Sequence, residues 1–195
     1  MDLTPARREI TTERLLLQAG DETLAESVAD FHRRNRRHFA PWDPPTADSF
    51  YTTATQAERI RLGLKAFAEG VGFRYWLSLS GEPARVIGSV HFSQVSRGAF
   101  HSCVLGYSLD ELCQGRGLMH EALSAAIDEM FSPQVNLHRI QAAYRPENKR
   151  SAAVLARLGF RPEGLAKDYL FIAGAWRDHQ LTALTNPMFN EPADW

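Results

Sequence analysis

Cysteine and long apolar runs are scarce in this chain. Its 195 residues include two cysteines, Cys103 and Cys113, and neither belongs to a C-x-x-C pair. A disulfide framework and a zinc site are therefore not expected, the sequence offers no set of metal ligands, and a reduced cytoplasmic setting fits. No segment approaches the roughly 20 apolar residues that cross a bilayer, and the first residues lack the apolar core of a signal peptide. We expect no membrane partner.

Net charge is also small. The formal charge is -1 at pH 7, so no long-range field draws the chain to nucleic acid, and we expect no direct DNA binding. The one concentrated basic stretch is HRRNRRH at residues 32–38; a solvated helix face and a contact with RNA or an acidic partner are both open for it. With 44% hydrophobic residues the chain can bury a substantial core, and we predict a single domain over residues 1–195.

Hydrophobic periodicity predicts alternating strands and helices. We expect strands at residues 9–19, 73–80, 86–93, a stretch ending at 109, 137–144, 160–172 and 176–184. We expect helices at residues 21–38, 55–69, 118–131 and 148–158. This order favours an α/β fold with a mixed, mostly antiparallel, twisted sheet of about seven strands, one parallel central pair, and helices on both faces.

The most informative stretch is QGRGLM at residues 114–119, between a predicted strand and a predicted helix. A helix start leaves backbone N–H groups unpaired, and the helix dipole adds roughly half a positive charge there. Gly115 and Gly117 let a phosphate approach the backbone closely. A plain tight turn into the helix is the alternative. No Lys-Ser or Lys-Thr pair follows the glycines, which excludes the phosphate loop of nucleoside triphosphatases. His120 stands where a dinucleotide-binding loop has its third glycine, so that motif is incomplete.

Several ordered motifs resemble the GCN5-related N-acetyltransferase (GNAT) family. The loop resembles the family's Q/R-x-x-G-x-G/A pyrophosphate loop, with Met119 in place of the small last residue. Other similar segments are TTERLLL at 11–17, NKRS at 148–151, LGF at 158–160 and EG at 163–164. Four more, FAPW at 39–42, GYS at 106–108, KDYL at 167–170 and WRDH at 176–179, narrow the resemblance to the RimJ/RimL branch, and there to the RimJ type that acetylates a ribosomal-protein alanine. The resemblance covers about residues 10–185.

The resemblance implies acetyl-CoA as cosubstrate, with no other cofactor. In this family the two parallel central strands splay apart, pantetheine pairs with the edge of one of them, and N–H groups of the loop hold the pyrophosphate. Asn148 is expected to bond the pantetheine arm; an N-cap role is the alternative, and the two can coexist. The residues expected to contact acetyl-CoA are Tyr107, Ser108, Leu109, Gln114, Gly115, Arg116, Gly117, Leu118, Met119, His120, Asn148 and Ser151.

The resemblance also implies the chemistry. Because the thioester is already activated, the protein has to position the amine, accept its proton and protonate the departing thiolate. Ser151 matches the serine that protonates the thiolate in the resembled enzymes, with a solvated or backbone-bonding serine in the first helical turn as the alternative. Leu155 replaces a tyrosine acid of other branches, and Leu170 replaces a glutamate base. Asp168, two residues before Leu170 and on the same face of the predicted strand, is our candidate base, with a plain surface aspartate as the alternative.

The resemblance points to the N-terminal amine of a small-subunit ribosomal protein as acceptor, with alanine as its first residue. Another protein N-terminus, a small-molecule amine, and a non-catalytic acyl-CoA-binding factor on the ribosome are the competing functions. Trp42 can wall an acceptor groove or plug the edge of the core. His101 can relay a proton or be a buried structural histidine. The sequence leaves open whether the chain is a monomer or a homodimer.

Overall fold

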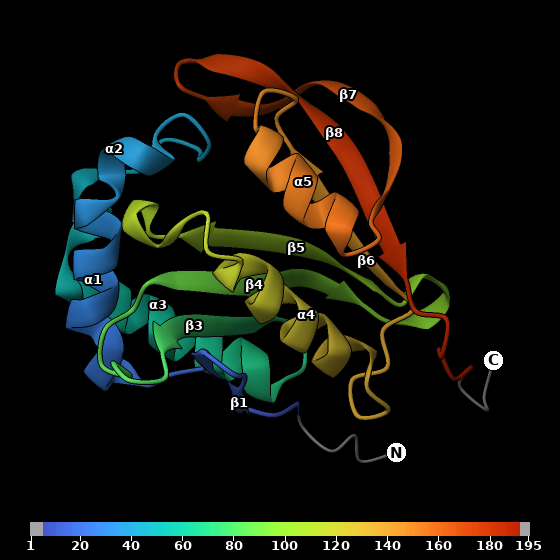
Figure 1. The fold of residues 1–195 in the computed structure, drawn as a ribbon, viewed down its shortest axis with the longest axis horizontal. Coiled ribbons are helices and arrows are strands. Elements are labelled where there is room, and N and C mark those ends of the chain that lie inside the picture. Colours follow the sequence, from blue (N-terminus) through green and yellow to red (C-terminus); the bar gives the residue numbers. More distant parts are fainter. Residues whose placement is uncertain (1–5, 192–195) are drawn as a thin grey trace.

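The computed structural model describes residues 6–191, which form a mixed eight-stranded sheet with helices on both of its faces (Figure 1). The strands are β1 (Glu9–Thr11), β2 (Leu15–Gln18), β3 (Phe73–Leu79), β4 (Gly88–Ser96), β5 (Ser102–Leu109), β6 (Arg139–Tyr144), β7 (Arg161–Ile172) and β8 (Ala175–Thr185). The α-helices are α1 (Ala25–Arg34), α2 (Arg36–Phe39), α3 (Thr53–Ala68), α4 (Leu118–Phe131) and α5 (Lys149–Arg157).

The order of strands across the sheet is β1-β2-β3-β4-β5-β6-β8-β7. Within residues 6–191, every neighbouring pair is antiparallel except β5 and β6, which α4 connects in a crossover. A parallel pair requires such a crossover because its two strands start at the same end of the sheet. The predicted mixed sheet with one parallel central pair is therefore confirmed.

Two predicted elements are divided in the structure. The strand expected at residues 9–19 is a hairpin of β1 and β2, since Thr12 turns the chain and its N–H donates to the carbonyl of Leu15 at 2.9 Å. The sheet has eight strands for this reason. The helix expected at 21–38 ends and restarts at Asn35, whose side-chain amide donates to the carbonyl of Phe31 at 2.9 Å.

The parallel pair separates before its strands end. Ladder pairing runs from Ser102 opposite Arg139 to Leu105 opposite Ala142. Beyond that point β5 continues to Leu109 while it stays paired with β4 on its other side. One edge of β5 therefore lies open from Gly106 onward. This is the splayed pair that the resemblance implied.

The core has two parts, one on each side of the sheet. The larger part packs α4, in front of the strands in Figure 1, against the sheet through residues such as Leu123, Ile127 and Met130. The smaller part joins α1 and α3 to the back of the sheet around Phe31 and Trp76. Both free thiols, Cys103 and Cys113, are buried packing residues of the larger part. None of the helices within residues 6–191 is long and apolar enough to cross a membrane.

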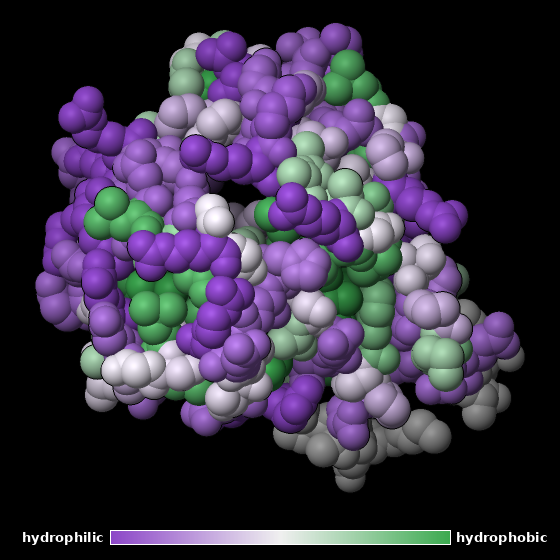
Figure 2. Space-filling view, viewed as in Figure 1, coloured by the Kyte–Doolittle hydropathy of each residue, from purple (hydrophilic) through white to green (hydrophobic). Residues whose placement is uncertain are grey.

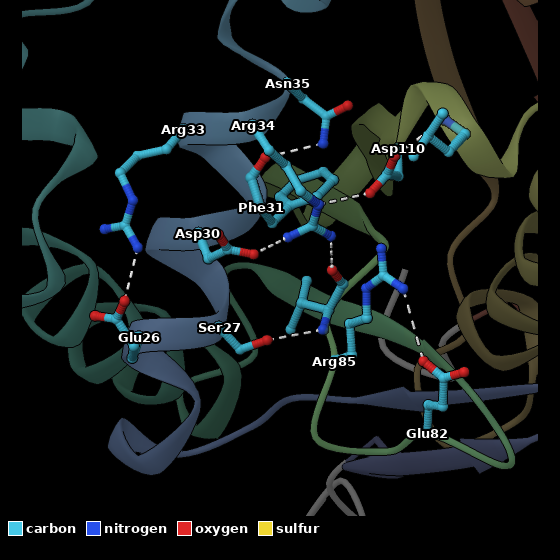
Figure 3. Close-up of polar contacts among 12 residues, drawn as sticks. Glu26, Ser27, Asp30, Phe31, Arg33, Arg34, Asn35, Glu82, Arg85 and Asp110 are labelled. Atoms are coloured by element: carbon cyan, nitrogen blue, oxygen red, sulfur yellow. Dashed lines mark hydrogen bonds and ion pairs between the residues drawn. The ribbon is translucent and has the colours of Figure 1, made fainter.

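The basic stretch at residues 32–38 is largely paired within the protein. Arg34 binds the buried carboxylate of Asp110 at 2.7 Å and also contacts Asp30 and the carbonyl of Val86 (Figure 3). Arg33 contacts Glu26 on its own helix, and Arg36 contacts Asp48 at 2.8 Å. The Arg34–Asp110 pair fixes the end of α1 against the end of β5. It thereby sets the position of α2 and of the loop that follows.

Candidate active site

A cavity of about 330 Å³ opens at the splayed end of β5. Figure 2 shows the surface hollowed between the segments that Figure 1 labels α2 and α5. Its walls come from four places: α2 and the loop after it, β5, the start of α4, and α5. The lining residues are His38, Phe39, Trp42, Asp43, Tyr107, Ser108, Leu109, Gln114, Gly115, Gly117, Leu118, Met119, His120, Asn148, Arg150, Ser151, Ala153, Val154 and Arg157.

The glycine loop presents free backbone donors to this cavity. Gly115 and Gly117 have φ of +76° and +78°, in the left-handed region that favours glycine, and Gly117 is the N-cap of α4. Among the described residues, none accepts a hydrogen bond from the N–H groups of residues 115–120. These N–H groups, together with the dipole of α4, form a site suited to a phosphate-bearing ligand.

The N-terminal hairpin holds the loop from behind. Arg14, at the turn between β1 and β2, donates to the carbonyl of Arg116 at 2.9 Å. The same guanidinium binds Glu121 of α4 at 2.6 Å, and Glu121 also accepts from Thr12 at 2.6 Å. Burial acts to raise the pKa of Glu121, but hydrogen bonds from Thr12 and Arg14 outweigh it and lower that pKa. The charged Glu121 carboxylate thus holds Arg14 in the position from which it binds the carbonyl of Arg116 in the loop.

Gln114 joins two walls of the cavity. Its side-chain amide nitrogen lies 2.8 Å from Nε2 of His38 on α2, and its amide oxygen accepts from Arg150 on α5 at 2.6 Å. The sequence placed Gln114 in the cofactor loop, whereas its contacts with His38 and Arg150 come from the fold. They span 76 and 36 positions of the chain.

The hydroxyls of Tyr107 and Ser151 are in contact beside the open edge of β5. Their oxygens lie 2.7 Å apart, which joins β5 to the first turn of α5. Burial raises the pKa of Tyr107 to about 12, and the bond with Ser151 opposes that shift only partly. Asn148 is the N-cap of α5, since its side-chain oxygen accepts from the N–H of Ser151 at 3.1 Å. The predicted capping role of Asn148 is therefore present, and its amide N–H groups stay available.

Two of the predicted site residues lie outside the cavity wall. Arg116 is exposed and is not among the lining residues, although its neighbours Gly115 and Gly117 are. Asp168 is also exposed, with φ of +48°, and its N–H donates to Asp178 at 3.1 Å. The argument that placed Asp168 and Leu170 on one face is wrong, because β7 bulges between Ala166 and Leu170 and loses its alternation.

The cavity wall also includes residues that were not predicted from the sequence as site residues. His38, Phe39 and Asp43 reach the cavity from the α2 segment, and Arg150 and Arg157 reach it from α5. Trp42, predicted as a possible groove wall, is one of the lining residues. His101 lies directly before β5 and is buried, with Nδ1 2.6 Å from the carbonyl of Gly98, and it does not line the cavity. Within residues 6–191 there is no group of three or more potential metal ligands.

Comparison with known proteins identifies the family. The model of the acetyltransferase (GNAT) domain family matches residues 14–161. The chain belongs to the GNAT family. The [ribosomal protein uS5]-alanine N-acetyltransferase of Escherichia coli is 46% identical over 181 residues, which are 91% of each chain. The probable N-acetyltransferase YjcK of Bacillus subtilis is 34% identical and covers 85% of this chain and 90% of its own.

Solved GNAT structures agree. The ribosomal-protein-S5-alanine acetyltransferase of Vibrio fischeri superposes with a TM-score of 0.90 at 39% identity, over 94% of this chain and 99% of its own. RimJ of Mycobacterium smegmatis, solved with CoA-disulfide, gives a TM-score of 0.83 at 31% identity, over 92% and 85%. Sequence and fold therefore both show that this chain is a GNAT acetyltransferase, and its cavity lies where the central parallel strands of that fold separate.

Proposed function

We propose that this enzyme transfers acetyl from acetyl-CoA to the N-terminal amine of a small-subunit ribosomal protein, with the alanine terminus of uS5 as its acceptor. The 46% identity with the Escherichia coli uS5-alanine enzyme, over 91% of both chains, carries the proposal. The Vibrio fischeri structure, at a TM-score of 0.90, supports it. A ribosomal acceptor places the reaction in the cytoplasm.

We assign the pyrophosphate to the glycine loop. The N–H groups of residues 115–120 lack acceptors among the described residues, and positive φ at Gly115 and Gly117 turns the backbone there. A diphosphate would supply the missing acceptors at a helix N-terminus. Gln114, Leu118, Met119 and His120 line the same wall, and the exposed Arg116 lies between the lining residues Gly115 and Gly117 in the chain.

We assign the pantetheine arm to the open edge of β5. Tyr107, Ser108 and Leu109 line the cavity and pair with β4 only on their other side. An extended ligand can add to such an edge as a further strand does. The free amide N–H groups of Asn148 are placed to bond the same arm from α5. Bound in this way, acetyl-CoA supplies an activated thioester next to Ser151.

We assign the proton for the departing sulfur to Ser151. Its hydroxyl bonds to Tyr107, whose raised pKa keeps it protonated, so the pair holds a proton at Oγ of Ser151. Capping by Asn148 fixes the backbone of Ser151 and hence the direction of its side chain. Both hydroxyls lie in the cavity wall, where general-acid catalysis by a positioned group is effective.

The decisive experiment measures release of CoA thiol with a panel of acceptors. The panel holds a uS5 N-terminal peptide, the same peptide already acetylated, N-terminal peptides of other ribosomal proteins, and small-molecule amines. We expect release with the free uS5 peptide, none with the acetylated one, and the gain of one acetyl mass on its first residue. Release of CoA thiol only with a small amine would show that the acceptor is a small molecule. Binding of acetyl-CoA without release for any acceptor would show that the protein is a binding factor and not an enzyme.

A further inference from the structure

The cavity has a marked charge asymmetry. Among the described residues that line it, Asp43 is the only one that carries a carboxylate. The other ionisable side chains facing the same space are His38, Tyr107, His120, Arg150 and Arg157. The two arginines lie on α5, and His120 lies in the first turn of α4, directly after the glycine loop. Asp43 comes from the loop after α2. The acidic wall is thus separate from the wall suited to phosphate.

Asp43 is held firmly in this wall. The N–H groups of Trp42 and Asp43 both donate to the carbonyl of Phe39 at 2.8 and 3.0 Å, which closes the chain tightly at the end of α2. Arg145, in the segment between β6 and α5, donates to the carbonyl of Pro41 at 2.5 Å and lies over the ring of Trp42, 5.5 Å from its centroid. The Asp43 loop is therefore attached to the segment that leads to Asn148 and Ser151.

Within residues 6–191, no side chain or backbone group donates a hydrogen bond to the Asp43 carboxylate or forms an ion pair with it. The residue keeps contact with solvent, yet the surrounding wall removes its carboxylate from enough water to raise its pKa from 3.8 to about 6. A lone carboxylate with a raised pKa in the wall of a cavity is a candidate for a functional role.

We propose that Asp43 is the general base of the acetyl transfer: it binds the acceptor's N-terminal ammonium and, once this has lost one proton to solvent, accepts the second proton that the nitrogen loses as it is acylated. The proposal rests on the proposed function, since it takes the acceptor to be an amine. An ammonium is the chemical complement of a lone carboxylate, and the acceptor has to enter beside Ser151, across the cavity from α2. Asp43 takes the role that the sequence had assigned to Asp168, which lies outside the cavity wall.

The proton balance of the step closes with the groups present. The ammonium gives one proton to solvent, the amine nitrogen bonds to the thioester carbon, and the bond from that carbon to sulfur breaks. The nitrogen's second proton passes to the Asp43 carboxylate, directly or through one water, and sulfur takes a proton from Ser151. Asp43 then releases its proton to solvent and Ser151 regains one through Tyr107. A base that is ionised near neutral pH and titrates about two units below an amine of pKa ~8 suits this transfer.

The test compares Asp43→Asn with Asp48→Asn. Both remove one negative charge at nearly constant shape, but the Asp48 side chain is 87% exposed and its partner is the surface residue Arg36. For Asp43→Asn we expect kcat/KM for the amine to fall about 10²- to 10⁴-fold while the Kd for acetyl-CoA stays within about twofold. We expect Asp48→Asn to match the wild type in both. Asp43→Glu should recover part of the rate.

The pH profile distinguishes a base from a structural residue. In the wild type, kcat/KM should rise through an inflection near 6, and this inflection should be absent from Asp43→Asn, whose residual rate follows only the free amine. Wild-type kcat/KM in Asp43→Asn, an unchanged inflection, or a parallel loss of acetyl-CoA affinity would each overturn the assignment. The assay uses whichever amine of the panel accepts acetyl, so failure of the uS5 peptide alone refutes the acceptor and not the base.

A direct titration covers the case in which no amine accepts. Carbon-13 NMR of the Asp43 carboxyl should give a pKa of about 6 in the full chain, against 3.8 for an ordinary aspartate. Addition of a peptide with a free N-terminus should lower that pKa, whereas the acetylated peptide should not. An ordinary pKa that does not respond to either peptide would refute the role of Asp43.

Discussion

Tyr107 and Ser151 share a hydrogen bond of 2.7 Å across the gap between β5 and α5, although 44 positions separate them in the chain. One residue comes from the strand whose edge is open, and the other from the first turn of a helix that Asn148 caps. Their contact brings two hydroxyl groups to the point where the two parallel strands diverge.

Ser151→Ala should slow turnover by about 10- to 10⁴-fold, because the departing sulfur would have to take its proton from water. Tyr107→Phe should have a smaller effect, since Ser151 keeps its own hydroxyl. Single-turnover measurements with saturating acetyl-CoA would compare the two variants. Wild-type rates in Ser151→Ala would leave the serine with only its structural contact to Tyr107.

Gly117→Val should weaken acetyl-CoA binding by at least about tenfold, which corresponds to about 1.4 kcal/mol. A β-branched residue resists the positive φ of this position and would turn the loop's N–H groups away from their ligand. Gly98→Val is the matched control, because Gly98 also has a positive φ and open space around it but lies outside the cavity lining. Calorimetry of both variants separates backbone strain from loss of the ligand site. Equal affinities would contradict the role given to the loop.

Asp110→Asn should lower the free energy of unfolding by about 3 kcal/mol, because it leaves Arg34 beside a partner that no longer carries charge. Asp30→Asn, which removes the exposed partner of the same arginine, should cost less than about 1 kcal/mol. Chemical denaturation of the two variants provides the comparison. Similar losses would show that the buried pair is not what holds α1 against β5.

The same pair makes a pH prediction. Burial acts to raise the pKa of Asp110, but hydrogen bonds from Arg34 and the N–H of Leu112 hold it below its ordinary 3.8. A lowered carboxyl pKa contributes stability that is fully present above 3.8 and is lost as the pH falls through the lowered value. The stability of wild type and Asp110→Asn should therefore converge as the pH falls below about 4.

Both thiols should resist alkylation while the protein is folded. Burial raises the pKa of Cys103 to about 12, with Arg97 opposing it, and burial also raises the pKa of Cys113. At pH 8 a thiol of that pKa is ionised in only about one molecule in 10⁴. Mass spectrometry after iodoacetamide should find both cysteines unmodified in buffer and both modified in urea. Rapid labelling of native Cys113 would show that the segment before the glycine loop opens.

The sequence predicted the sheet, the crossover helix and the glycine loop because each depends on local signals: apolar periodicity, and glycines at a helix start. It missed the turn at Thr12, which contains neither glycine nor proline. It did not foresee the bulge in β7, which interrupts the alternation that the argument for Asp168 used. Asp43 gave no signal, since its position in the cavity depends on the contact of Arg145 with the carbonyl of Pro41, 104 positions away.

The hold of Arg14 on the carbonyl of Arg116 ties the outer hairpin of the sheet to the loop that faces the cavity. Occupancy of the loop and closure of that hairpin are therefore thermodynamically linked, so that each favours the other. Amide hydrogens of β1 and β2 should exchange with deuterium more slowly once acetyl-CoA is bound, at a distance from any atom of the ligand. Exchange in the edge strands β1 and β2 thus measures whether the cavity at the centre of the sheet is occupied.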